Sequence, residues 1–488
     1  MALPELKKLL EGAAYSPRSL SFAFDAEKLW PSLSARAHGF LWIATGMAEP
    51  GPVPFDRMYG RVWADDPDTM TVFDSLNRDE QAEVLAVYTY EIHELTHHSD
   101  YLITPYGFNI HGKLLREYVA FQRFVPLLLA DPPPAGCRLV DWDPLTGKPR
   151  SDRFRDAWTT LRDIVHTLEA FGDGGMLPRA EVVTKGWSGE TRPFTLFMRS
   201  LQRVTVRGFL TTVTVPDESR WYLRPATILE TRGLVHSLLW ILHLFGGGNR
   251  ARGPLLTYLH VFYDSAMIPP DYNMLLAVIA SGWGFDSFHQ FVEKEDMAVV
   301  RSALAIADAS CWYALQAPPP MPDTSAFANP VVRLLLALAY FIGWKKEDRF
   351  FPAAADALAA MDTRPEARAL SLRPIETILA FCERFIEAMQ SINSEIVSPV
   401  FRGHFQHVLE VQRRQLTFRR RGGYVSYVGM PEDGHPARGL QSYEESRGLA
   451  FRDYVPDARI VEWFAFRQQL LYGFVTTDDL QSKLPLFF

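Results

Sequence analysis

The residues of this chain best suited to chemistry lie in one short stretch, YEIHELTHHSDYL, at residues 90–102. On an α-helix, side chains four positions apart lie on one face, so His93 and His97 can direct ring nitrogens at the same ion. Glu94 is rotated by one residue and would lie beside that ion, where it could accept a proton from water. The spacing therefore predicts a metal site with an adjacent general base.

The run His93-Glu94-Leu95-Thr96-His97 resembles the HExxH motif of the zincin metallopeptidases. The resemblance covers this helix and not the whole chain. It implies that the cofactor is Zn²⁺, that the two histidines bind it and that Glu94 activates water. It also implies a peptide or protein substrate.

A catalytic zinc site has a third protein ligand and leaves one position open for water. The longer motif of metzincins is absent, because position 100 is Asp and position 103 is Ile. The resemblance then implies a glutamate ligand, as in gluzincins. Two glutamates are candidates, Glu230 and, as the alternative, Glu117.

Helical geometry distinguishes these two glutamates. Glu117 falls within an arc of about 120° that it shares with Lys113, Arg116 and Arg123, which predicts a solvated face. Glu230 instead has uncharged neighbours on its face of the helix: Ala226, Thr227, Gly233, Leu234, Ser237 and Ile241. A carboxylate on such a face needs a compensating cation, either a metal or an arginine, and small neighbours allow close approach of another helix. We therefore expect Glu230 to be the third ligand.

Other polar side chains near these residues are candidates for supporting roles. Asp100 lies one turn beyond His97 and could accept a hydrogen bond from a ligand imidazole. Tyr222, Arg232 and His236 could stabilise charge in the transition state. Arg232 and His236 share the face opposite Glu230, however, so they could equally form a structural pair. For His98 we expect an exposed position.

The elements that must position these residues can be predicted from local signals. Asn77 and Glu80 form a capping pair for a helix from Glu80 to about Ile103, which Pro105 and Gly107 should end. Residues 58–63 and 69–74 are predicted to form a β-hairpin around ADDPD. A second, apolar helix is expected from about Pro225 to Phe245, followed by a glycine-rich turn. The predicted fold is α+β and predominantly α-helical, with the motif helix beside a small antiparallel sheet.

Two proline clusters, at residues 131–136 and 317–323, divide the chain into three predicted blocks. Residues 1–130 would contain the hairpin and the motif helix. Residues 137–316 would form a mixed α/β block that supplies the candidate third ligand. Residues 324–488 would be mainly helical, with a basic tail region.

Composition limits the classes of partner and compartment. A formal charge of −7 argues against a broad nucleic-acid surface. Cys137, Cys311 and Cys382 are too few and too far apart for a disulfide framework or a zinc ribbon. The longest apolar runs are too short to span a bilayer, so we expect a soluble, cytoplasmic protein.

A second hypothesis comes from another class of protein. The chain would then be a non-catalytic or regulatory helical protein that binds a protein partner and has a structural metal site or none. The peptidase hypothesis also allows a protein regulator. The oligomeric state stays open under both hypotheses.

Overall fold

The computed structural model describes residues 33–46, 62–134, 137–146, 149–172, 225–264, 272–316, parts of 330–341, 350–363, 375–419, 456–474 and 476–488, and the backbone of five strand segments. The helices are α3 (Ala35–Thr45), α5 (Pro67–Ser75), α6 (Arg78–Ile103), α7 (Pro105–Ala130), α8 (Asp152–Gly172), α10 (Pro225–Leu244), α11 (Arg252–Leu259), α12 (Met274–Gly282), α13 (Phe288–Lys294), α14 (Met297–Leu315), α16 (Ala354–Thr363), α18 (Ile375–Asn393), α19 (Pro399–Arg419), α21 (Ala458–Tyr472) and α22 (Thr477–Lys483). Short 3-10 segments lie at Trp63–Asp65, Leu139–Asp141, Asn249–Ala251 and Leu484–Leu486, and a π-helical segment at His260–Asp264.

The predicted α+β fold is wrong. Where side chains are described, the molecule is 82% helical and contains no strand. The second half of the predicted hairpin, residues 69–74, lies inside α5, and residues 58–61 fall outside the described residues. The physical reason is local. The Asp66 side chain accepts hydrogen bonds from the backbone N–H groups of Asp68 and Thr69, and Pro67 occupies the first turn, where its missing N–H costs nothing.

The strand segments of the chain lie elsewhere and are short. The antiparallel pair β1 (Ala13–Ser16) and β2 (Ser21–Phe24) precedes the first described helix. A three-stranded sheet has the order β4 (Thr211–Thr212), β3 (Ala180–Thr184), β5 (Ser219–Leu223), with β3 parallel to β4 and antiparallel to β5. Neither corresponds to the predicted hairpin.

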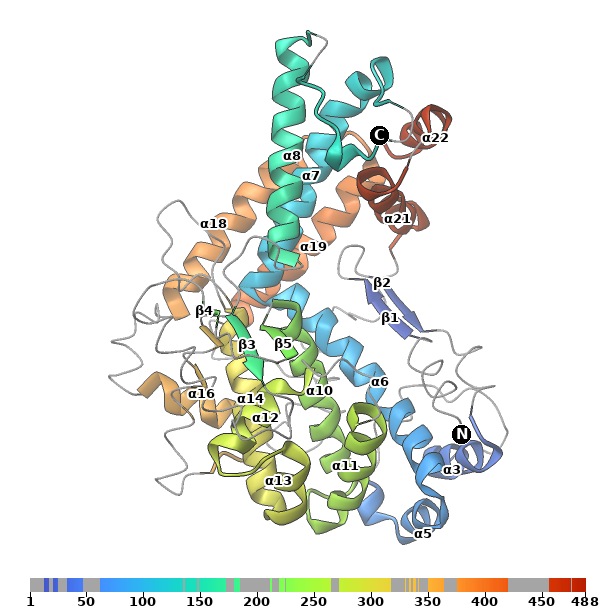
Figure 1. Cartoon of the computed structure of the whole chain (residues 1–488), viewed down its shortest axis with the longest axis vertical. Coiled ribbons are helices and arrows are strands. Elements are labelled where there is room, and N and C mark those ends of the chain that lie inside the picture. Colours follow the sequence, from blue (N-terminus) through green and yellow to red (C-terminus); the bar gives the residue numbers. More distant parts are fainter. Residues whose placement is uncertain are drawn as a thin grey trace.

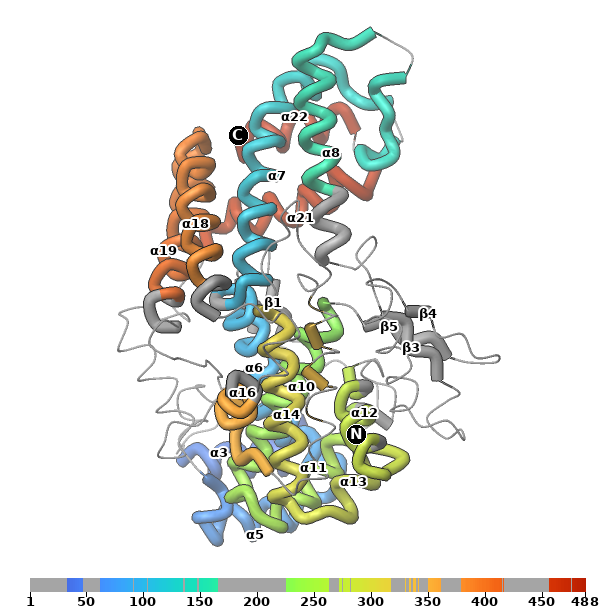
Figure 2. Tube along the Cα trace, turned by 90° about the vertical axis from the view of Figure 1, so that its left-hand side faces the viewer, coloured from blue at the N-terminus to red at the C-terminus, as the bar shows by residue number. Residues whose placement is uncertain are grey.

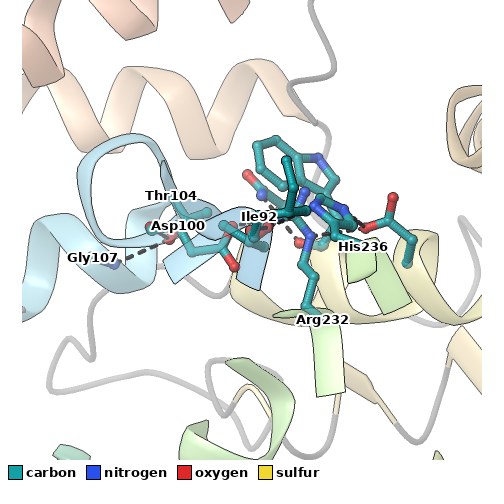
Figure 3. Close-up of polar contacts among 10 residues, drawn as sticks. Ile92, Asp100, Thr104, Gly107, Arg232 and His236 are labelled. Carbon is teal, nitrogen blue, oxygen red and sulfur yellow. Dashed lines mark hydrogen bonds and ion pairs between the residues drawn. The ribbon is translucent and has the colours of Figure 1, made fainter. Parts of the chain in front are cut away.

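The motif helix α6 begins as predicted. The Asn77 side chain accepts from the backbone N–H of Glu80, and the Glu80 carboxylate accepts from the backbone N–H of Asn77, a complete capping box. The end of α6 differs from the prediction, because Pro105 starts α7 instead of only stopping α6. Thr104 makes the break by donating to the Asp100 carbonyl and accepting from the Gly107 N–H, as Figure 3 shows.

Helix α10 lies at the centre of the molecule, packed between α6 and α14 (Figures 1 and 2). The expected helix from Pro225 is confirmed. Nearly every side chain along it is buried, and the turn that follows places Gly246 and Gly247 at positive φ, 71° and 70°. Helix α14 is long and apolar enough to cross a membrane by length and composition, and 78% of its apolar window is buried inside the structure.

The second long helix, α7, runs through the upper half of the molecule in Figure 2. It extends away from α6 and is packed against α8, α18 and α19 (Figure 2). Helix α21 adds a buried contact, in which Arg467 donates to both carboxylate oxygens of Glu117 at 2.8 and 2.6 Å. The predicted solvated face is therefore wrong at Glu117 and Lys113, which are 1% and 9% exposed.

Candidate metal centre

Three side chains from two helices meet at one point between α6 and α10. His93 and His97 lie one turn apart on α6, and Glu230 lies in the second turn of α10. One carboxylate oxygen, Oε2 of Glu230, lies 2.9 Å from His93 Nε2 and 3.2 Å from His97 Nε2. The structure thus brings together residues 133 to 137 positions apart in the chain.

This arrangement fits the donor set of a catalytic zinc ion. Two imidazoles and one carboxylate are the three protein ligands of a common catalytic type. Ligand atoms about 2.1 Å from a tetrahedral ion are about 3.4 Å apart, close to the two distances from the Glu230 oxygen. The side chains of His93, Glu94 and His97 also bring potential ligand atoms within 4.8 Å of one another. The residues present therefore fit Zn²⁺.

Glu94 lies beside the three side chains without taking part in the two bonds to Glu230. Its side chain is partly exposed. The exposed fraction of the side chain is 9% for His97, 16% for His93 and 27% for Glu230. The site is therefore closed on the His97 side and open to solvent at Glu94 and Glu230, as a site that admits a substrate must be.

Gly233, one turn after Glu230, lets the two helices approach. A Cβ atom at this position would lie 2.8 Å from both Cε1 and Nδ1 of the His93 ring. Contacts between such atoms are ordinarily 3.4–4 Å. Only a glycine therefore lets α10 carry Glu230 this close to the motif helix.

The charges of the site are coupled. Burial would lower the pKa of His97, but the Glu230 carboxylate raises it above its ordinary value. Burial would likewise raise the pKa of Glu230, but His97 and His93 hold it well below its usual range. The carboxylate is therefore ionised and able to bind a cation.

A second, fully buried polar cluster joins side chains of α6, α10 and α14, and Figure 3 labels three of its residues, Asp100, Arg232 and His236. Oδ1 of Asp308 accepts from Nε of Arg232 at 2.9 Å and is 3.0 Å from Nε2 of His236. Arg232 also donates to Asp100, and His236 Nδ1 lies 2.8 Å from the Thr96 hydroxyl. We call these five side chains the Asp308 network.

The other predicted site residues take different places. Glu117 lies in the α7–α21 ion pair and not beside the histidines. Arg232 and His236 are fully buried in the Asp308 network and do not face the open side of the site. The side chain of Tyr222 lies outside those that the structure describes. His98 is 6% exposed, so the expected exposed position is wrong.

Asp100 does not accept from a ligand imidazole in this structure. Its Oδ1 pairs with Arg232, whereas its Oδ2 is buried without a hydrogen-bond partner in the described part of the chain. The same holds for Nδ1 of His97, one helical turn earlier. A buried acceptor and a buried donor thus lie on adjacent turns of α6 without bonding.

Sequence reasoning missed Asp308 and the role of Thr96. Asp308 carried a usable signal, because it is the one charged residue in SALAIADASCWYAL, residues 302–315. A carboxylate in so apolar a helix requires a buried cation or several donors. Thr96 carried no such signal, since a threonine in a helix is ordinary.

The chain was compared with protein-family models, with curated proteins and with solved structures, and no match was found.

Proposed function

We propose that the chain is a zinc-dependent hydrolase that cleaves peptide bonds. The observation that carries the proposal is the position of the Glu230 carboxylate, within 2.9 and 3.2 Å of the two ring nitrogens of the HExxH motif. His93, His97 and Glu230 would hold the ion. Zn²⁺ bound there would polarise the carbonyl group of a substrate and lower the pKa of a bound water molecule to about 7.

Glu94 has the position and chemistry of the general base. Its carboxylate lies beside the ligand atoms, on the open side of the site. It would take a proton from the attacking water and deliver it to the leaving amine, so that one residue serves as base and then as acid. Substitution of such a group commonly lowers the rate by about 10²–10⁴-fold.

Asp100 would support His97 once the site is loaded. A histidine that binds metal through Nε2 carries its proton on Nδ1, and ligand histidines usually donate that proton to a carboxylate or carbonyl. Both Nδ1 of His97 and Oδ2 of Asp100 are buried without a partner among the described residues. A hydrogen bond between them would satisfy both atoms.

The test compares the wild type with Glu94→Gln, first for zinc content and then for cleavage of a mixed peptide library analysed by mass spectrometry. The proposal expects one zinc in both proteins and cleavage by the wild type, with the variant slower by at least about 100-fold. Equal cleavage by the two proteins would contradict the role of Glu94. A zinc-free, fully folded wild type would support the non-catalytic alternative.

A further inference from the structure

We propose that Asp308 is a positioning residue for the candidate metal centre: through Arg232 and His236 it fixes α10 against α6 and thereby holds Glu230 beside the two histidines. The inference rests on the proposed function, in that the site it organises is the zinc site. Asp308 itself lies on α14, and its Oδ1 contacts Arg232 and His236 of α10 at 2.9 and 3.0 Å.

The site needs such a device because its ligands come from two helices. A slide or rotation of α10 by about 1 Å would move Glu230 out of reach of one histidine, since ligand distances tolerate only about 0.2 Å. Apolar packing does not define register this sharply, because cores accept shifts and substitutions of apolar groups. At the contact itself, Gly233 offers no side chain to interlock with His93.

The Asp308 network supplies directional bonds at this place. Arg232 and His236 lie four residues apart on α10, and both point at the same oxygen, Oδ1 of Asp308. From there Arg232 reaches Asp100, and His236 reaches Thr96. Two turns of α10 are thus tied to the two turns of α6 that flank His97.

The hydrogen bond between His236 and Asp308 has a defined direction. A carboxylate can only accept, so the proton between His236 and Asp308 lies on Nε2. The Thr96 hydroxyl lies 2.8 Å from Nδ1 of His236, and it donates its single proton either to that nitrogen or to the Ile92 carbonyl of its own helix, 2.7 Å away. Thr96 lies inside the HExxH motif, next to His97, so this series of contacts connects α14 with α6, the helix that carries both histidines.

Burial makes this network rigid. Arg232, His236 and Thr96 are 0% exposed, and Asp308 is 1% exposed. The guanidinium carbon of Arg232 also lies 4.8 Å from the centre of the Trp312 ring, on the same helix as Asp308. A buried charged group that loses its partner must reorganise or admit water, and the reorganisation here would move α10.

The test measures zinc affinity by competition with a chromophoric chelator, and the visible spectrum of the Co²⁺-substituted protein, for the wild type and three variants. Asp308→Asn keeps the shape but removes the charge, and Thr96→Val removes the hydroxyl that contacts His236 and that also reaches the Ile92 carbonyl of its own helix. The matched control is Ser310→Ala on the same helix as Asp308, because Ser310 is equally buried and its hydroxyl likewise donates to a carbonyl of its own helix, that of Ile306.

Asp308→Asn should weaken zinc binding about 10- to 100-fold and alter the Co²⁺ spectrum. Thr96→Val should weaken binding about fivefold, as expected for one lost hydrogen bond. Ser310→Ala should bind as the wild type does. Zinc affinities of Asp308→Asn and Thr96→Val within twofold of the wild type, with unchanged Co²⁺ spectra, would overturn the inference even if both variants melt at lower temperature.

The histidine ring signals in the NMR spectrum of metal-free, histidine-labelled protein separate this inference from the proposed function. Loss of the ordering of α10 should shift the signals of His93 and His97 in Asp308→Asn, and unchanged signals would overturn the inference. A wild type that binds no zinc would overturn the proposed function whatever these signals show.

Discussion

Substitution of Gly233 by alanine tests whether the close contact of α6 and α10 builds the metal centre. The added Cβ would lie 2.8 Å from Cε1 and Nδ1 of His93, so the ring or the helix must yield by at least 0.6 Å, the difference between 3.4 and 2.8 Å. Either movement displaces His93 Nε2 relative to the Glu230 carboxylate, 2.9 Å away. Zinc affinity should therefore fall.

The size of the effect follows from the cost of overpacking. One added methyl group in a tight contact costs about 1–3 kcal/mol. If this strain is released by moving a ligand, the dissociation constant for zinc rises about 5- to 140-fold, since about 1.4 kcal/mol corresponds to a factor of ten. Helix propensity acts in the other direction, because alanine is favoured over glycine within a helix by up to about 1 kcal/mol.

The assay is competition for zinc against a chromophoric chelator, with Gly403→Ala as the matched control. Gly403 also lies inside a helix, α19, and a Cβ there would meet no heavy atom within 4 Å. The control should bind zinc as the wild type does. If Gly233→Ala also binds zinc with wild-type affinity, then the close approach of α10 is not what places the ligands.

Two further predictions concern regions away from the site. Glu117→Gln leaves Arg467 buried without its carboxylate. In denaturant titrations the free energy of unfolding should fall by about 3–5 kcal/mol, while zinc affinity stays unchanged. Loss of zinc binding would instead identify Glu117 as a ligand. Burial, with His111 and His407 nearby, lowers the pKa of His404 to about 3. The contribution of neutral His404 to the stability of the folded protein is therefore complete above about pH 6.5. It declines towards pH 3, because the unfolded chain takes up a proton there and the folded chain does not. The stability difference between wild type and His404→Gln should therefore shift by about 2 kcal/mol between pH 7 and pH 5, and a difference independent of pH would contradict this.

Local signals in the sequence predicted the helices well. Asn77 and Glu80 cap α6 through bonds between residues three apart, and the glycines after Leu244 end α10 in a turn. The uncharged face around Glu230 predicted a carboxylate that needs a partner, and in the structure it lies beside His93 and His97. These features depend on neighbours in sequence or on one helix.

Predictions for single side chains failed where the residue that binds the side chain lies far away in the sequence. Glu117 was expected on a solvated face because its neighbours are charged, yet its partner Arg467 is 350 positions away. At Asp100 nothing in the sequence indicated that one carboxylate oxygen pairs with Arg232, which is 132 positions away. The hairpin failed for another reason, since the alternation at residues 69–74 suggested a strand while the cap at Asp66 determined a helix.

Anomalous diffraction at the zinc edge from crystals of the zinc-loaded protein tests the central claim most directly. We predict one peak about 2 Å from Nε2 of His93, Nε2 of His97 and a carboxylate oxygen of Glu230, with Glu94 beside it and not bound. A peak elsewhere, or a peak at the two histidines with Glu230 turned away, would show that these three residues do not form the metal centre.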